Sequence, residues 1–203
     1  MKLYFSPASP YVRKVLACAI ELGLDERIER LPSKAHPIDR DRQIVADNPL
    51  GQVPTFFTDD GTVLYDSRVI CEYLDTLAGG NRLFPAAGPR RWRALVAQAR
   101  GDGVLTAALL ARYESILRPP AQQSTAWQDA QMDKVRCALD DMAATIAEDG
   151  GRVDIGTITT ACALGYLDFR FPEEDWRTPR PLLAQWYGTF AARPALARTV
   201  PAA

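Results

Sequence analysis

The feature that most constrains the fold is a change of pattern partway along the 203-residue chain. In the first part, short β-type runs alternate with segments whose apolar residues have helical spacing. After AGGNRLFPAAGP, a segment whose glycines and prolines interrupt both patterns, only helical spacing remains. We therefore expect an α/β domain over residues 1–78, a linker over 79–88 and an all-α domain over 89–203. A chain of this length can form two small cores.

The first part predicts the order strand, helix, strand, helix, strand, strand, helix. The expected strands cover residues 2–5, 28–31, 55–58 and 62–65, and the expected helices cover 10–23, 39–46 and 68–77. The first three elements form a right-handed parallel βαβ unit, and Asp-Asp-Gly between the last two strands indicates an antiparallel hairpin. Gly23 is expected to end the first helix. The last helix is expected to bury an apolar face made of Val69, Ile70, Tyr73, Leu74 and Leu77.

The second part predicts four helices. They cover residues 90–118, 122–149, 157–171 and 181–192. We expect a kink in the first helix at its Gly-Asp-Gly sequence, residues 101–103, and an end to the second at Gly150-Gly151. Asp154 is expected to cap the third helix, paired with Thr157 three residues later.

Composition and charge exclude several classes of function. The chain is 47% hydrophobic and 24% charged, with a formal net charge of -1, so it lacks the clustered positive charge of a nucleic-acid-binding protein. No apolar run approaches the roughly 20 residues that a membrane helix needs. The N-terminus lacks the apolar core of a signal peptide, so we expect a cytoplasmic protein.

The cysteines and the single histidine argue against a metal site. The four cysteines, Cys18, Cys71, Cys137 and Cys162, form no CxxC pair, and each lies in an apolar helical stretch. We expect all four to be buried thiols that pack as small hydrophobic side chains. His36 stands beside a proline in a loop.

Four motifs in this order resemble those of a bacterial glutathione S-transferase of the serine type: SPASPYVRKV, NPLGQVPT, LYDSRVICEYLD and ACALGYLDFR. The resemblance covers essentially the whole chain. It implies a thioredoxin-like N-terminal domain, an all-helical C-terminal domain and, as a rule, a homodimer. It also implies a detoxification enzyme that conjugates glutathione to an apolar electrophile, with no metal.

The motif around Val53 and Pro54 has two interpretations. Pro54 alone could merely open a strand, where proline is tolerated. The resemblance implies a cis bond between the two residues, which leaves the N–H and C=O of Val53 free to pair with glutathione as a short added strand. Gln52 would then donate its amide to the glycine carboxylate of glutathione.

Asp66 and Ser67 begin the last helix of the first part. Both residue types cap helices, and a helix N-terminus also attracts anions. The resemblance implies that Ser67 holds the γ-glutamyl carboxylate of glutathione. We expect Asp66 to be the weaker contact, because a carboxylate is unfavourable beside another one.

Ser9 precedes Pro10 at the start of the first helix, where it can act as a cap. A hydroxyl that accepts a hydrogen bond can still donate its own proton. The resemblance implies that Ser9 donates this proton to the sulfur of glutathione and so favours the thiolate, which attacks the electrophile. Ser6 and Tyr4 are alternatives for this role. A serine in place of cysteine disfavours thiol–disulfide exchange.

The remaining contacts are less defined by the sequence. We expect the electrophile to bind between the domains, near Phe5, Ala8, Tyr11 and Tyr113. One basic residue of the loop SKAHPIDRDR would contact the glycine carboxylate, or the whole loop is solvated; the candidates are Lys34, His36, Arg40 and Arg42.

Two other functions remain open, because a fold does not fix a function. One is a glutathione-binding protein without significant turnover. The other is a lyase or isomerase that uses glutathione as a cofactor.

Overall fold

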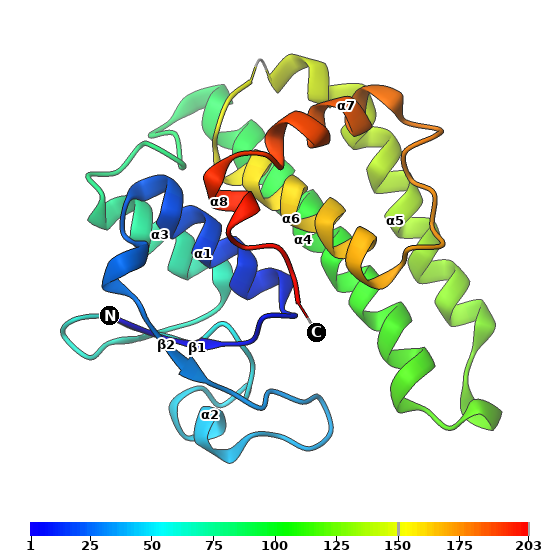
Figure 1. Ribbon diagram of the computed structural model, residues 1–203, viewed down its shortest axis with the longest axis horizontal. Helices are drawn as coiled ribbons and strands as arrows, with labels where there is room; N and C mark the ends of the chain where they lie inside the picture. The colour runs from blue at the N-terminus through cyan, green and yellow to red at the C-terminus, as the bar shows by residue number, and fades with distance from the viewer. Residues whose placement is uncertain (150, 203) are drawn as a thin grey trace. The chain divides into compact units, whose positions relative to one another are not determined.

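A computed structural model describes residues 1–149 and 151–202 of the chain. The chain divides into two compact units (Figure 1). The first unit contains residues 1–91 together with the C-terminal segment from Pro194 onward, and the second contains residues 92–193. The sequence led us to expect that all residues after 88 belong to one helical domain. In the structure, the C-terminal segment instead returns to the first unit.

The elements follow the expected order, with short additions. The strands are β1 (Lys2–Phe5), β2 (Glu29–Pro32), β3 (Phe56–Phe57) and β4 (Val63–Leu64). The α-helices are α1 (Pro10–Leu22), α2 (Arg42–Asp47), α3 (Ser67–Leu77), α4 (Gly88–Leu117), α5 (Thr125–Thr145), α6 (Ile155–Arg170), α7 (Pro181–Phe190) and α8 (Pro194–Ala197). Three 3₁₀ helices are η1 (Asp25–Arg27), η2 (Pro120–Gln122) and η3 (Ile146–Asp149).

The first unit is a thioredoxin-like α/β domain. Its sheet has the strand order β2-β1-β3-β4, with β1 parallel to β2 and the other two pairs antiparallel. Helices α1 and α3 lie side by side, and α8 also packs on α1 (Figure 1). The hairpin strands are shorter than expected because Thr58 and Thr62 belong to the turn: the Thr58 hydroxyl and the Thr62 N–H both bond to Asp60.

Helix α1 begins and ends as its sequence predicts. The Ser9 side chain accepts a hydrogen bond from the N–H of Val12, and Pro10 is the first helical residue. Gly23 ends the helix with φ +73°, in the left-handed region that glycine occupies most readily. The N–H of Gly23 bonds back to the carbonyl of Ile20, which satisfies one of the free carbonyls of the last turn.

The predicted inner face of α3 is partly wrong. Ile70 and Leu74 are fully buried, but Val69 is 48% and Leu77 38% exposed, and Tyr73 is half-buried. Cys71 and Asp75 are buried in their place.

The buried Asp75 explains why the inner face of α3 differs from the predicted one. Its carboxylate accepts hydrogen bonds from the N–H groups of Arg82, Leu83 and Phe84, at 3.2, 2.7 and 3.4 Å. Leu83 and Phe84 are themselves 3% exposed. Part of the expected linker is therefore packed into the first unit rather than free.

The second unit is built around the close packing of α4 on α6. A Cβ atom on Gly101 would lie 2.8 Å from Thr159 Cγ2, and one on Gly156 would lie 2.6 Å from the Cβ of Ala97. Helix α4 runs through residues 101–103 without a break, and Gly101 allows the close approach of α6. The two helices run in the same direction (Figure 1).

The start of α6 is fixed by the predicted capping box. The Thr157 N–H donates to Asp154 Oδ1 at 3.0 Å, and the Asp154 N–H donates to the Thr157 hydroxyl at 2.9 Å. Every residue of α6 from Ile155 to Leu167 is buried. The expected end of the preceding helix at Gly150 lies outside the described residues.

Cys18, Cys71 and Cys162 are buried, but Cys137 is exposed on α5, so the expectation for that residue is wrong. From residue 89 to 149 and from 151 to 202 the chain contains no strand. Within the described part of the chain, no helix combines the length and apolar character needed to span a bilayer.

We expect Asp154→Ala to destabilise the protein, because it leaves the Thr157 N–H without its acceptor at a buried helix start. The expected loss is about 1 kcal/mol in the free energy of unfolding, read from the urea midpoint. Asp154→Asn keeps a side-chain oxygen and should retain most of the stability. Equal losses in the two variants would contradict this assignment.

Candidate functional site

Three segments that the sequence singled out meet at one end of the sheet. Ser9 follows β1, Val53 and Pro54 precede β3, and Asp66 and Ser67 follow β4. Because β3 is antiparallel to both β1 and β4, the end of β1, the start of β3 and the end of β4 lie at the same edge. All of these residues belong to the first unit.

The register of the strands brings the segments into line. Leu3 pairs with Phe56, and Phe56 pairs with Leu64. The pairing of β1 continues one residue further, since the Tyr4 N–H donates to the Thr55 carbonyl at 2.9 Å. If this register is continued past the strand ends, residue 53 lies opposite the β1–α1 loop on one side and opposite the start of α3 on the other.

Ser9 is half-buried and retains a free donor. Its hydroxyl oxygen accepts from the Val12 N–H at 3.3 Å, and it donates no hydrogen bond to any residue that the structure describes. No acidic residue stands in the first turn of α1, so the positive end of the helix dipole is uncompensated there. A thiol placed at this helix start would be acidified.

The two alternatives to Ser9 are placed differently. Tyr4 is 3% exposed, and its hydroxyl donates to Asp47 Oδ2 at 2.8 Å. Burial and this hydrogen bond both raise the pKa of Tyr4. Ser6 lines a separate cavity together with Arg13 and Arg30.

The segment before β3 has the backbone expected from the resemblance. The bond between Val53 and Pro54 is cis, as is the bond between Tyr65 and Asp66. The N–H and C=O of Val53 make no hydrogen bond within residues 1–149 and 151–202. The side chain of Gln52 is exposed, while its carbonyl is held inside the loop.

The sequence did not indicate what holds this loop. Asn48 is 1% exposed and donates through Nδ2 to the Thr55 hydroxyl at 2.8 Å, and that hydroxyl donates to the Gln52 carbonyl at 2.7 Å. Asn48 Oδ1 also accepts from the Leu50 N–H at 3.0 Å. The Asn-Pro start of the motif was the available signal, because asparagine commonly bonds to the backbone two residues on.

At the start of α3 the cap and the expected contact are separate residues. Asp66 is exposed and its Oδ1 accepts from the Arg68 N–H at 2.9 Å, so it is the cap. Ser67 is 2% exposed, and its hydroxyl makes no hydrogen bond within the described part of the chain. The first N–H groups of a helix have no partner inside the helix, so Ser67 offers a hydroxyl and an N–H to an anion.

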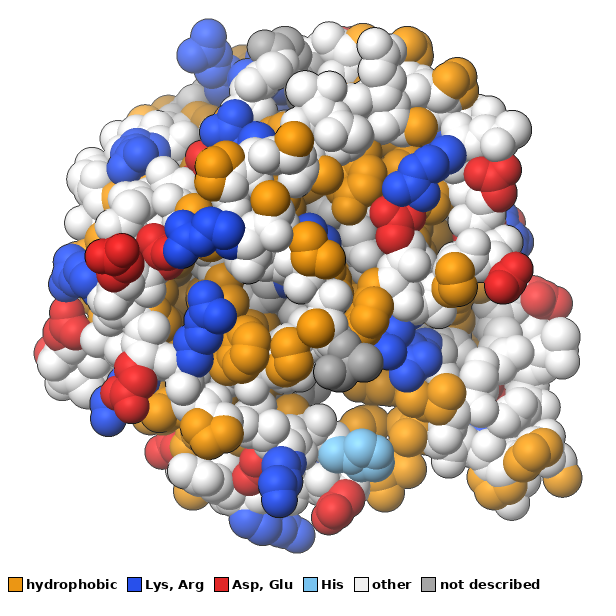
Figure 2. Space-filling model, in the orientation of Figure 1, with side chains coloured by type: hydrophobic (Ala, Val, Ile, Leu, Met, Phe, Trp, Pro, Cys, Tyr) orange, Lys and Arg blue, Asp and Glu red, His pale blue; other side chains and the backbone are white. Residues whose placement is uncertain are grey.

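Two of the four basic candidates in residues 33–42, the segment that follows β2, have local partners. The His36 ring accepts through Nδ1 from the Asp39 N–H at 3.0 Å, and Arg40 donates to the Pro49 carbonyl at 2.6 Å. Lys34 and Arg42 are exposed, and their side chains remain the candidates for a carboxylate contact. Figure 2 shows basic and acidic side chains interspersed on one face, with the imidazole at the surface.

The expected substrate-pocket residues are divided between the units. Phe5, Ala8 and Tyr11 are half-buried in the first unit, and Tyr113 is half-buried in the second. Burial raises the pKa of Tyr113.

Two arginines of the second unit, Arg112 and Arg170, lie close enough for the charge of Arg112 to lower the pKa of Arg170, and Arg112 directly precedes Tyr113. Arg112 follows Gly101 by eleven residues, and Arg170 follows Thr159 by the same distance. Eleven residues make about three helical turns, so the arginines continue the two faces that touch at Gly101 and Thr159.

These arginines have no acidic partner in the part of the chain that the structure describes. Neither makes an ion pair or a hydrogen bond with any described residue; the Arg170 guanidinium instead lies 3.8 Å from the centre of the Phe169 ring. Burial lowers the pKa of Arg170, and the charge of Arg112 lowers it further. The pair forms a positive site next to two aromatic rings. We call Arg112 and Arg170 the arginine pair.

Comparisons with known proteins match this architecture. Residues 8–77 match the model of the glutathione S-transferase N-terminal domain, and residues 125–189 match that of the C-terminal domain. The chain is 33% identical to an uncharacterized glutathione S-transferase-like protein of Escherichia coli K12, YibF, covering 99% of this chain and 98% of that protein.

Two crystal structures from Pseudomonas fluorescens Pf-5 are similar over nearly the whole chain. One, a glutathione transferase family member with bound glutathione, is 45% identical, with a TM-score of 0.96 over 100% of this chain and 99% of that one. The other, with bound S-(propanoic acid)-glutathione, is 44% identical, with a TM-score of 0.92 over 99% of each chain.

A thioredoxin-like domain joined to an all-helical one defines the glutathione S-transferase fold. The chain belongs to the glutathione S-transferase family. Within the described residues, no group of three or more His, Cys, Asp or Glu side chains could hold a metal ion.

Tyr4→Phe tests whether the buried phenol takes part in the site. Because its hydroxyl is bonded to Asp47, we expect the variant to lose about 1 kcal/mol of stability and to leave the pKa of bound glutathione unchanged. Thermal unfolding and thiolate absorbance measure the two effects. Tyr73→Phe, whose hydroxyl has no partner among the described residues, is the control for loss of a phenol. A raised thiol pKa in Tyr4→Phe would contradict the placement.

Proposed function

We propose that the protein is a glutathione transferase in which Ser9 stabilises the glutathione thiolate for attack on an electrophilic small molecule. The observation that carries the proposal is the free hydroxyl proton of Ser9 at the uncompensated N-terminus of α1. The hydroxyl would donate to the sulfur while still accepting from the Val12 N–H. Charge-assisted hydrogen bonds and the helix dipole both favour the thiolate.

The remaining contacts of glutathione would come from the same sheet edge. The free N–H and C=O of Val53, the residue before Pro54, would pair with the backbone of the cysteine in glutathione as a short added strand. The Ser67 hydroxyl and N–H would hold the γ-glutamyl carboxylate, with Asp66 capping the helix beside it. The exposed amide of Gln52 would donate to the glycine carboxylate.

The reaction follows from these roles. The thiolate attacks the electrophilic carbon, a carbon–sulfur bond forms, and the leaving group departs with the bonding electron pair. Ser9 keeps its own proton throughout, so it is a stabiliser and not the nucleophile. The protein would act in detoxification, in the cytoplasm and as a homodimer, and the exposed Leu50 and Val69 supply apolar surface for pairing.

Ser9→Ala tests this proposal. We expect the pKa of the bound glutathione thiol to rise by about 1 to 2 units. Because each pKa unit corresponds to about 1.4 kcal/mol, or a factor of about ten, kcat/KM should fall roughly 10- to 100-fold. Thiolate absorbance against pH and steady-state kinetics measure the two effects. Ser9→Thr retains the hydroxyl and should restore most of both.

Loss of the helix cap alone would lower stability and leave the thiol pKa unchanged. That result would instead favour the alternative of a glutathione-binding protein without turnover. A normal thiol shift with turnover restricted to one metabolite would favour a glutathione-dependent lyase or isomerase.

We further propose that the second substrate carries an acidic group, which pairs with Arg112 and Arg170. The arginine pair has no acidic partner among the described residues, and two adjacent guanidinium groups without one favour a carboxylate. The relative that binds S-(propanoic acid)-glutathione supports this, because the group on its ligand's sulfur carries a carboxylic acid. Tyr113 and Phe169 would contact the apolar part of such a substrate.

A matched pair of aryl chlorides, 4-chloro-3-nitrobenzoate and its amide, tests the proposed acidic group. In both, the thiolate displaces chloride from the same ring carbon. We expect Arg112→Gln and Arg170→Gln each to raise KM for the benzoate about 10-fold, the effect of one charge-assisted hydrogen bond, and to leave the amide unaffected. Arg118→Gln, directly after the end of α4 and paired with Glu114, is the control. Equal effects on both substrates would refute the acidic preference.

A further inference from the structure

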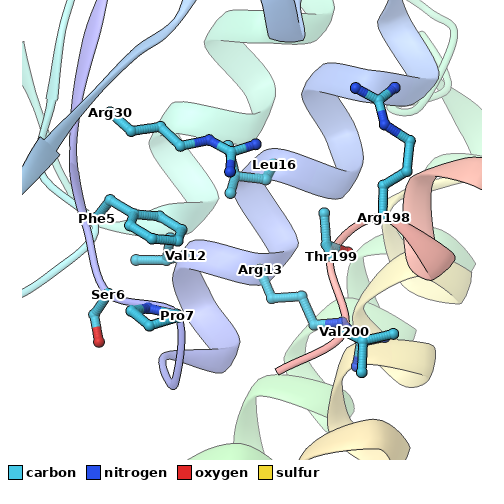
Figure 3. A pocket seen from close by; sticks show the side chains of 10 residues that line it. All are labelled: Phe5, Ser6, Pro7, Val12, Arg13, Leu16, Arg30, Arg198, Thr199 and Val200. Carbon is cyan, nitrogen blue, oxygen red and sulfur yellow. The ribbon is translucent and has the colours of Figure 1, made fainter. Parts of the chain in front are cut away.

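A cavity of the first unit lies apart from the residues that are proposed to bind glutathione. It has a volume of about 200 Å³ and lies between the end of β1, α1, β2 and the segment that follows α8 (Figure 3). Its polar lining consists of Ser6, Arg13, Arg30, Arg198 and Thr199. Neither Ser9, Val53 nor Ser67 lines it.

Arg13 is the buried group of this cavity. It is 4% exposed, and among residues 1–149 and 151–202 only its Nη2 has a partner, the Leu196 carbonyl at 3.3 Å. Its Nε and Nη1 are buried and have no hydrogen-bond partner among these residues. Buried polar groups are nearly always paired, and an unpaired guanidinium edge is especially costly, so these two donors indicate a missing acceptor.

The charges around the cavity are not balanced. Arg198 is paired with Asp25 at 2.6 Å. Arg30 has no acidic partner among the described residues, and its guanidinium lies 5.2 Å from the centre of the Phe5 ring. Figure 3 shows Arg30 and Arg198 on opposite sides of Leu16. Since Arg13 also has no acidic partner among the described residues, two positive charges at this cavity are not compensated by that part of the chain.

We propose that the cavity binds a small oxyanion with two negative charges, such as hydrogen phosphate or a short dicarboxylate. Arg13 supplies the buried contact, because the Nε–Nη edge of a guanidinium matches two oxygens of one anion. Arg30 supplies the second charge at the cavity wall. The volume exceeds that of a few water molecules, whose share is about 30 Å³ each, so it admits such an ion with its hydration.

The bound anion would also fasten the C-terminal segment to the first unit. Arg13 on α1 already holds the Leu196 carbonyl, and the Ala202 N–H donates to the Pro7 carbonyl at 3.4 Å. An anion that binds only the folded protein stabilises it in proportion to its occupancy. The predicted readout is therefore the thermal stability of the full chain, which requires no glutathione and is independent of the proposed catalytic function.

The test is the thermal unfolding midpoint of the full-length protein in rising inorganic phosphate, with sodium chloride holding the ionic strength constant. We expect a saturable rise with phosphate. The same titration with succinate identifies the source of the chemistry: a response to phosphate alone indicates a phosphate ligand, and a response to succinate indicates a dicarboxylate. Absence of a saturable response to both anions would overturn the proposal.

Two variants assign the response to the cavity. Arg13→Met keeps an unbranched apolar stem and removes the charge, so we expect it to abolish the saturable response and to be at least as stable as the wild type without phosphate. Arg30→Gln, at the exposed wall, should raise the half-saturating concentration at least fivefold even if Arg13→Met does not fold. Arg93→Gln, an exposed arginine of α4, should respond as the wild type does. An unchanged response in Arg30→Gln, or in a folded Arg13→Met, would refute the site.

Discussion

The antiparallel pairing of β1 with β3 is the constraint on which the candidate site depends. The hydrogen bond from the Tyr4 N–H to the Thr55 carbonyl fixes the last step of this pairing. A slip of one residue would turn every side chain of β3 to the opposite face and move Val53 away from the β1–α1 loop. Asn48 resists such a slip, since its buried amide ties the loop to the Thr55 hydroxyl.

At each position of the site, the structural role leaves some hydrogen-bonding capacity unused. Ser9 caps α1 with its lone pair and keeps its proton, and Asp66 caps α3 in a way that leaves the Ser67 hydroxyl free. Both are helix starts, where the backbone already presents unpaired N–H groups to an anion. The proposed binding of glutathione would therefore use the same helix termini as folding without competing for the same atoms.

The sequence predicted what depends on neighbours along the chain. The cap at Ser9, the end at Gly23 and the Asp154 capping box were all found because each is a local pattern. It did not predict what depends on distant partners. The burial of Asp75 requires the backbone of residues 82–84, and the burial of Arg13 requires the carbonyl of a residue far along the chain.

The return of the last segment makes the first unit discontinuous in the chain. The ribosome synthesises residues 92–193 before it adds α8 and Arg198. Helix α8 then packs on α1, and Arg198 pairs with Asp25. While the protein is being made, one side of α1 therefore stays open until the segment from Pro194 onward has been added. The first unit cannot complete its core before the second unit has been synthesised, and the apolar surface exposed in the meantime is a hazard for the nascent chain.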